Sequence, residues 1–96
     1  MNLLGIDVGT TGTKAVLFDE RGAALGSGYR EYPLMTPRPG YVTQSAPAWW
    51  EAAVGSVRDA LEAAGTAGVG AIGLSTQGGS MTAVDREFRP LCDVMT

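Results

Sequence analysis

Residues 3–19 read LLGIDVGTTGTKAVLFD, two apolar runs joined by a short turn of glycines and threonines. Glycines let backbone N–H groups come close to phosphate oxygens, threonine hydroxyls add donors, and Lys14 adds positive charge. Asp7 ends the first run, where an ionised carboxylate is costly unless a cation neutralises it. Mg²⁺ is a natural cation beside a phosphate. The stretch therefore indicates a phosphate site, with ATP and Mg²⁺ as the expected ligands.

The same residues also suit an ordinary β-hairpin, because aspartate and glycine are common turn formers. Two better-known phosphate motifs do not apply. No G-x-x-x-x-G-K-S/T sequence occurs in the chain. The turn also leads into a second strand, whereas a dinucleotide-binding turn leads into a helix. The assignment of a phosphate site therefore depends on the rest of the chain.

The composition excludes several classes of function. The 96 residues carry a formal charge of −3, and the seven basic residues are scattered, whereas a nucleic-acid surface needs clustered Lys and Arg. The chain has no histidine and one cysteine, Cys92, which argues against Ser-His, Cys-His and zinc chemistry. No apolar run approaches the roughly 20 residues of a membrane span. We therefore expect no nucleic-acid or membrane partner and a cytoplasmic location.

The predicted elements follow the order β-β-β-α-β-β. Strands are expected at residues 2–7, 14–19, 23–32, 71–75 and 81–85, with a turn at 85–88 and an irregular, proline-containing loop at 33–45. A crossover helix makes strand 71–75 parallel to an earlier strand, which we expect to be the first. The turns after Asp7 and Ser75 would then lie at one edge of the sheet, where α/β sheets bind ligands. The predicted class is α/β, with a mixed sheet and one main crossover helix.

The helix between residues 45 and 65 has clear boundary signals. Ser45 suits the N-cap, Pro47 suits the first turn, and Gly65 suits the position after the last turn. The apolar residues recur at spacings of three and four, which predicts one buried stripe of Trp50, Val54, Val57, Leu61 and Ala64.

Four blocks of the chain match one family in order. They are GIDVGTTGTK at 5–14, PGYVTQ at 39–44 followed by Trp49-Trp50, IGLSTQGG at 72–79, and the predicted strand ending at Asp85 followed by RPL at 89–91. On these blocks the chain resembles the N-terminal part of the FGGY carbohydrate kinases, sugar and polyol kinases with the actin-like ATPase (ribonuclease H-like) fold. The first block alone also occurs in other actin-like proteins, so the combination carries the resemblance.

The resemblance implies transfer of the ATP γ-phosphate to a hydroxyl of a sugar or polyol, with Mg²⁺. Asp7 would organise the Mg²⁺, usually through water. The residues that would contact the phosphates are Gly9, Thr10, Thr11 and Lys14. Phosphoryl transfer depends mainly on positioning and charge neutralisation, which suits these residue types.

The loop Gln77-Gly78-Gly79 lies where the family contacts the acceptor, so Gln77 and Gly78 are the expected substrate-binding residues. Xylulose kinases tend to have Gln-Met-His here, and glycerol kinases tend to have Gln-Arg-Glu. This chain offers only backbone at Gly78 and Gly79, so the acceptor stays open. The glycines also suit a tight turn or bulge.

Trp49 and Trp50 lie at the start of the predicted helix. One of them is expected in the core. The other could line a sugar cleft, since aromatic faces suit the C–H faces of sugars. Gln44 is expected either at the same cleft or bonded to nearby backbone.

The family's general-base aspartate would lie beyond Thr96, so no residue of this chain is expected to act as that base. We interpret residues 1–96 as the N-terminal part of the first domain of a carbohydrate kinase, with little or no kinase activity alone. Unpaired sheet edges would favour self-association. Two alternatives stay open: a non-catalytic nucleotide-binding or interaction module, and a ribonuclease H-like nuclease in which Asp7 would hold metal.

Overall fold

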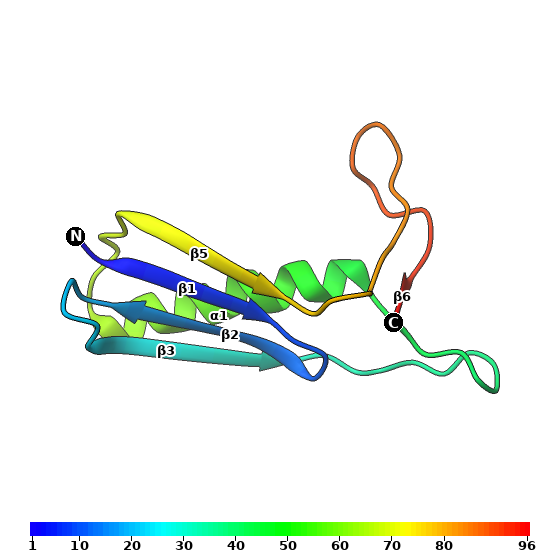
Figure 1. Ribbon diagram of the computed structural model, residues 1–96, viewed down its shortest axis with the longest axis horizontal. Helices are drawn as coiled ribbons and strands as arrows, with labels where there is room; N and C mark the ends of the chain where they lie inside the picture. Colours follow the sequence, from blue (N-terminus) through cyan, green and yellow to red (C-terminus); the bar gives the residue numbers. More distant parts are fainter.

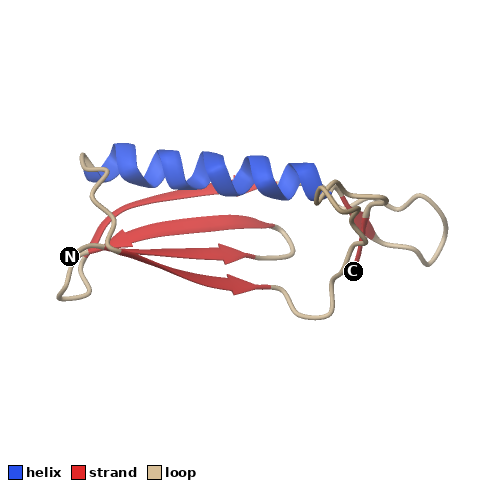
Figure 2. Ribbon diagram, turned by 90° about the horizontal axis from the view of Figure 1, so that it is seen from above, coloured by secondary structure: helices blue, strands red, loops and turns tan.

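The computed structural model describes all of residues 1–96 and contains a four-stranded mixed sheet with one helix on one face (Figure 1; Figure 2). The elements are β1 (Leu3–Val8), β2 (Gly12–Phe18), β3 (Ala24–Glu31), β4 (Thr43–Gln44), α1 (Ala46–Ala64), β5 (Ala71–Thr76) and β6 (Val94–Met95). The strand order is β3-β2-β1-β5, with β1 antiparallel to β2 and parallel to β5. The consecutive hairpins, the crossover helix and the parallel pairing are thus confirmed. Residues 9–11 join β1 to β2 and are called the β1–β2 turn.

The helix α1 begins and ends where the sequence predicts. Ser45 is the N-cap, and its Oγ accepts a hydrogen bond from the Ala48 N–H at 3.2 Å. Gly65 follows the last turn with a left-handed φ of 72°, a conformation that glycine adopts at little cost. Its N–H donates to the carbonyls of Leu61 and Glu62.

The face of α1 that packs on the sheet differs from the predicted stripe. Trp50 is 71% exposed, and the buried helix residues have small side chains: Ala52, Ser56 and Ala60. Gly26 and Gly28 of β3 explain why α1 presents small side chains to the sheet. The two elements lie so close that a Cβ on either glycine would overlap backbone atoms of α1. Helix and strand therefore meet almost backbone to backbone, and only small residues fit between them.

The core lies between α1 and the two central strands. Its members are Leu4, Ala15, Leu17 and Ala60, with Val57, Leu61 and Ala64 of the predicted stripe packed partly against them. Side chains alternate along β2, so that Thr13, Ala15 and Leu17 are fully buried while Lys14 is exposed on the other face. This alternation places Lys14 on the sheet face away from the helix.

Two predictions about the loops are wrong. The loop at 33–45 is not wholly irregular, because Thr43–Gln44 forms β4 and pairs with β6. The predicted strand at 81–85 does not form; Met81 and Val84 make only isolated bridges, to Met95 and Pro90. The first difference arises because β4 pairs with residues near the end of the chain, which local patterns do not encode. The element order is therefore β-β-β-β-α-β-β.

The predicted turn after residue 84 is confirmed. Asp85 Oδ1 accepts hydrogen bonds from the N–H groups of Glu87 and Arg89, both at 2.9 Å. These bonds hold the pKa of Asp85 below its ordinary value, with the Arg89 N–H as the largest cause.

Strand β5 lies at the edge of the sheet, beside β1 (Figure 1). Ile72 and Leu74 share a sheet face with their β1 partners Leu4 and Ile6, yet they are 64% and 67% exposed. A groove of about 470 Å³ lies between β5 and the start of α1 and is almost wholly apolar. No helix of the structure combines the length and the apolar character that a membrane crossing needs.

Candidate functional site

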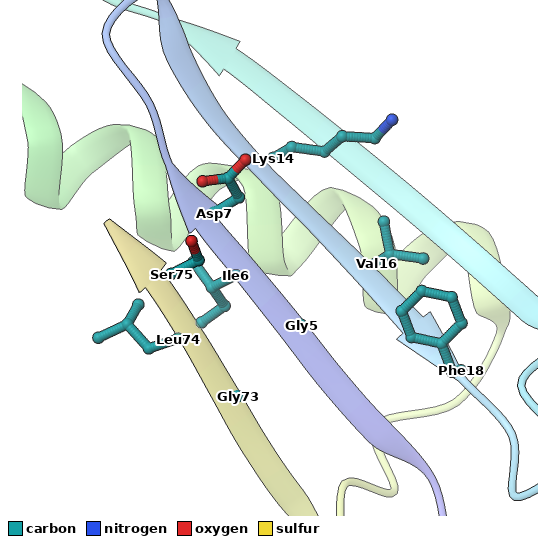
Figure 3. A pocket seen from close by; sticks show the side chains of 9 residues that line it. All are labelled: Gly5, Ile6, Asp7, Lys14, Val16, Phe18, Gly73, Leu74 and Ser75. Carbon is teal, nitrogen blue, oxygen red and sulfur yellow. The ribbon is translucent and has the colours of Figure 1, made fainter. Parts of the chain in front are cut away.

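Asp7 and Lys14 lie together at the end of the first hairpin, on the sheet face away from α1 (Figure 3). They are direct partners in the β1–β2 register, and Ser75 is the partner of Asp7 on β5. Neither charged group forms an ion pair within the protein. The neighbouring partners Gly5 and Gly73 have no side chains, which leaves a hollow of about 440 Å³ beside the two charges. Both charges are thus available to a ligand.

Side chains from three distant segments bind the carbonyl oxygens of the β1–β2 turn. The Gly9 carbonyl accepts hydrogen bonds from the Tyr32 hydroxyl and from Gln77 Nε2, the latter at 3.2 Å. The Thr10 carbonyl accepts from Gln44 Nε2 at 2.6 Å. Tyr32 follows β3, Gln44 ends β4, and Gln77 follows β5. The tertiary fold therefore brings these three donors to the turn.

The remaining carbonyls of this region are bound by backbone N–H groups. The Thr11 carbonyl accepts from the Tyr32 N–H at 3.2 Å, and the Gly12 carbonyl accepts from the Gly9 N–H at 2.9 Å. By contrast, the N–H groups of Thr10 and Thr11 have no acceptor within the protein, and both residues are exposed. Successive free N–H groups in a turn form a binding site for an anion.

The structure brings Gln77 to the β1–β2 turn. Besides its bond to Gly9, its Oε1 accepts from Thr10 Oγ1 and from Ser80 Oγ, both at 3.1 Å. Gly78 lies at the surface and contributes no side chain. Gly79 has a φ of 78°, as a tight turn requires. The predicted acceptor loop is therefore next to the predicted phosphate turn.

Sequence reasoning missed Tyr32. Its ring packs against Trp49 with 6.3 Å between centroids. Burial raises the pKa of Tyr32, so its hydroxyl stays protonated at neutral pH and donates to the turn. The register of the hairpin could have found it, since Glu31 pairs with Gly12 and the next residue must lie beside the turn.

The prediction that the tryptophan of the apolar stripe lies in the core is wrong, because Trp50 is exposed and the neighbouring Trp49 is the half-buried one. Trp49 Nε1 donates to Gln44 Oε1 at 3.2 Å. Gln44 is bonded to nearby backbone, at Thr10, which is one of its two expected roles.

The donor set at this site fits Mg²⁺ that arrives with a phosphate. Asp7 supplies one exposed carboxylate without a cation partner, and Mg²⁺ beside phosphates needs only one or two protein carboxylates because water fills its other positions. No group of three or more His, Cys, Asp or Glu side chains lies together in the structure. The carboxylate cluster that a two-metal nuclease needs is therefore absent from these residues.

The chain is similar in sequence and in fold to known proteins. The description "FGGY family of carbohydrate kinases, N-terminal domain" matches residues 2–96. A glycerol kinase of Thermococcus gammatolerans is 33% identical over 91 residues, which are 93% of this chain and 18% of that protein. The structure of a xylulose kinase of Brucella ovis superposes with a TM-score of 0.93 at 31% identity, covering 99% of this chain and 20% of that one. A gluconate kinase of Lactobacillus acidophilus gives a TM-score of 0.89 at 29% identity, with 99% and 19% covered.

The fold is the N-terminal portion of the actin-like ATPase fold, and a short turn joins its first two strands. Within that class, the chain belongs to the FGGY family of carbohydrate kinases. It spans about a fifth of the length of the relatives that it matches.

Proposed function

We propose that the protein carrying this chain transfers the γ-phosphoryl group of ATP to a hydroxyl of a sugar or polyol. The observation that carries the proposal is the β1–β2 turn, whose carbonyls are bound within the protein while the N–H groups of Thr10 and Thr11 are free. Such a turn, beside one free cation and one free carboxylate, suits a metal-bound polyphosphate. Membership in a family of carbohydrate kinases supports the same activity.

Each site residue has a role in this proposal. Thr10 and Thr11 donate N–H groups to phosphate oxygens, and Gly9 keeps the turn narrow. Lys14 adds positive charge on the same face as Asp7, which would hold Mg²⁺ through water. ATP with Mg²⁺ would supply the phosphoryl group and neutralise part of its charge.

The proposed acceptor is a small sugar or polyol. Proteins similar to this chain are named glycerol kinase, xylulose kinase and gluconate kinase, which sets the panel of candidates. We propose Gln77 and Gly78 as residues on the acceptor side, because their loop lies beside the β1–β2 turn. Without side chains, Gly78 and Gly79 leave room for the acceptor and offer backbone groups.

We also propose that residues 1–96 form the N-terminal part of the first domain of such a kinase. A cytoplasmic location, self-association through the edges at β3 and β5, and the absence of nucleic-acid and membrane partners stay predictions. The edges are the reason for expecting association, since unpaired strand edges recruit further chains.

The test is a titration of the protein, in the form its cells produce, with Mg-ATP, followed by an assay of acceptor-dependent ADP release with glycerol, xylulose and gluconate. Saturable binding is expected. Replacing Lys14 by Met or Asp7 by Asn should weaken it roughly tenfold or more, because each removes a charged contact. Arg58→Gln and Glu62→Gln are matched controls, since they remove the same charges from exposed positions on α1.

Two outcomes would contradict the proposal. Absence of saturable binding, or binding that the Lys14 and Asp7 substitutions leave unchanged, would exclude a phosphate site at the β1–β2 turn. Binding without ADP release for any acceptor would favour the alternative of a non-catalytic nucleotide-binding module.

A further inference from the structure

Each free N–H group of the β1–β2 turn belongs to a peptide group whose carbonyl is bound. In a trans peptide, the C=O and the following N–H lie in one plane and point in opposite directions, and the chain has no cis peptide bond. The Gly9 carbonyl shares a peptide group with the Thr10 N–H, and the Thr10 carbonyl shares the next one with the Thr11 N–H. A hydrogen bond that holds either carbonyl toward the protein therefore directs the next N–H away from it.

The carbonyls of the two peptide groups differ in how many hydrogen-bond donors they have. The Gly9 carbonyl accepts from two donors, the Tyr32 hydroxyl and Gln77 Nε2. The Thr10 carbonyl accepts from a single donor, Gln44 Nε2, at 2.6 Å. The orientation of the Thr11 N–H thus depends on one side chain, that of Gln44, which lies 34 residues after Thr10 in the chain.

Gln44 is itself held on both of its polar atoms. Its side chain has no exposed surface. Its Oε1 accepts from Gln77 Nε2 at 3.0 Å and from Trp49 Nε1 at 3.2 Å, which leaves Nε2 as the donor to Thr10. A buried amide whose oxygen accepts two bonds and whose nitrogen donates one is held in one orientation, because rotation would break these bonds away from water.

We propose that Gln44 is a positioning residue that sets the Thr10–Thr11 peptide group so that the Thr11 N–H faces the phosphates. The inference rests on the proposed function for its consequence in binding, but the orientation of the peptide group is independent of it. Gln77 has the same effect on the Gly9–Thr10 peptide group, where Tyr32 duplicates it. Gln77 thereby links the acceptor-side loop to the β1–β2 turn, Gln44 links β4 to it, and the two glutamines are bonded to each other.

The first arm of the test needs no nucleotide. In ¹H–¹⁵N spectra of the labelled chain, Gln44→Met should shift or broaden the Thr11 amide signal, because the Thr10 carbonyl loses its only donor. Val94→Ala is the matched control: Val94 is equally buried and pairs with Gln44 in the β4–β6 ladder, but has no bond to the turn. It should leave the Thr11 signal close to that of the unmodified protein.

The second arm measures Mg-ATP affinity and, in the active protein, the KM values for ATP and acceptor. Gln44→Met should weaken Mg-ATP binding about tenfold, as expected for one lost hydrogen bond to the turn. Gln77→Met should weaken it less, about threefold, because Tyr32 still holds Gly9. Val94→Ala should change affinity less than about twofold. In Gln44→Met, the KM for ATP should rise, while the KM for the acceptor should stay within about twofold of its value in the unmodified protein.

The outcomes separate this inference from the proposed function. If the unmodified protein binds no Mg-ATP, the proposed function fails, and the Thr11 amide signal still decides the role of Gln44. If Gln44→Met changes that signal no more than Val94→Ala does, the positioning role is overturned. A loss of thermal stability with unchanged Mg-ATP affinity would also overturn it, since that result describes a purely structural glutamine.

A second variant serves if Gln44→Met does not fold. Gln44→Glu keeps the length of the side chain and the acceptor oxygens for Trp49 and Gln77, but its ionised form cannot donate to Thr10. At a pH high enough to ionise this carboxyl, it should perturb the Thr11 amide as Gln44→Met does, whereas the protonated form can still donate to Thr10. A Thr11 signal like that of the unmodified protein in this variant would contradict the proposal.

Discussion

The two halves of the sheet carry similar apolar patterns but differ in what covers them. On β2, under α1, Leu17 has no exposed surface, whereas Leu74 on β5 is 67% exposed on the same face. Figure 2 shows α1 running along one side of the sheet, and Figure 1 shows β5 at the edge. Burial is therefore decided by where the helix lies, and the glycines of β3 decide that position by admitting the helix backbone.

The most direct comparison of the two halves is a pair of identical substitutions. Leu17→Ala should lower the free energy of unfolding by about 2–5 kcal/mol, because it removes a buried side chain and leaves a cavity. Leu74→Ala should lower it by less than about 0.5 kcal/mol, because its side chain is mostly hydrated already. Urea denaturation of the 96-residue chain, followed by circular dichroism, measures both.

If Leu17→Ala and Leu74→Ala lowered the free energy of unfolding equally, the two halves of the sheet would not differ in burial. Such a result would show that β5 is covered in solution, for example by a second copy of the chain over the apolar groove. Repeating the denaturation at two protein concentrations separates this case, since stabilisation by association depends on concentration.

A second pair of substitutions tests the reason for the helix position. Gly28→Ala should destabilise the protein by about 2–3 kcal/mol, because its Cβ would overlap the Ser56 carbonyl oxygen and push α1 off β3. Gly73→Ala on β5 adds a Cβ that meets nothing within 4 Å, so its effect should stay within about 0.5 kcal/mol. The same denaturation measurement applies, and a tolerated Gly28→Ala would mean that the glycine does not place the helix.

Local patterns predicted the covered half well. The two apolar runs of residues 3–19 form β1 and β2, Ser45 and Gly65 bound α1, and Asp7 pairs with Lys14 as the hairpin requires. The stripe on α1 was only partly correct: Val57, Leu61 and Ala64 pack against the core, but Trp50 is exposed. Periodicity locates apolar residues by their spacing, whereas close packing on Gly28 selects residues by size.

The parts that could not be predicted depend on contacts between distant segments. Strands β4 and β6 are two residues each and lie 50 residues apart, so neither carries a pattern of its own. The bond from Gln44 to Thr10 spans 34 residues, and its donor was known only as a loop glutamine. The charged residues of the candidate site were visible in sequence because they lie on one hairpin. The side chains that orient the turn were not, because the tertiary fold brings them there.

A third prediction concerns the end of α1 that borders the open groove. Ser45→Ala should destabilise the protein by about 1 kcal/mol, because the Ala48 N–H loses its acceptor. Ser27→Ala on the exposed side of β3 is the control and should change stability by no more than about 0.5 kcal/mol. The difference in urea midpoint between the two variants measures how much the capping hydrogen bond contributes to stability. A Ser45→Ala variant as stable as the control would mean that packing of the neighbouring Trp49, and not capping, fixes where the helix begins.

The smallest expected effect is the pH dependence of one ion pair on the covered half. Arg30 on β3 donates to both carboxylate oxygens of Asp59 on α1, at 2.8 and 3.0 Å. The hydrogen bond from Arg30 holds the pKa of Asp59 below its ordinary value. A lowered pKa in the folded state contributes stability above the pKa of the unfolded chain, near 3.9, and that contribution is lost as pH falls through the folded value.

Asp59→Asn should therefore lower the urea midpoint slightly at pH 7 and have a smaller effect at the lowest pH at which the protein still folds. The effect is small because both groups are exposed and screened by water. Asp85→Asn is the comparison, since that carboxylate also has a lowered pKa but is bonded within a single turn and joins no helix to the sheet. An Asp59→Asn difference that stays constant from pH 7 downward would show that the ion pair does not link α1 to β3, and that the helix is held there by the glycine contact alone.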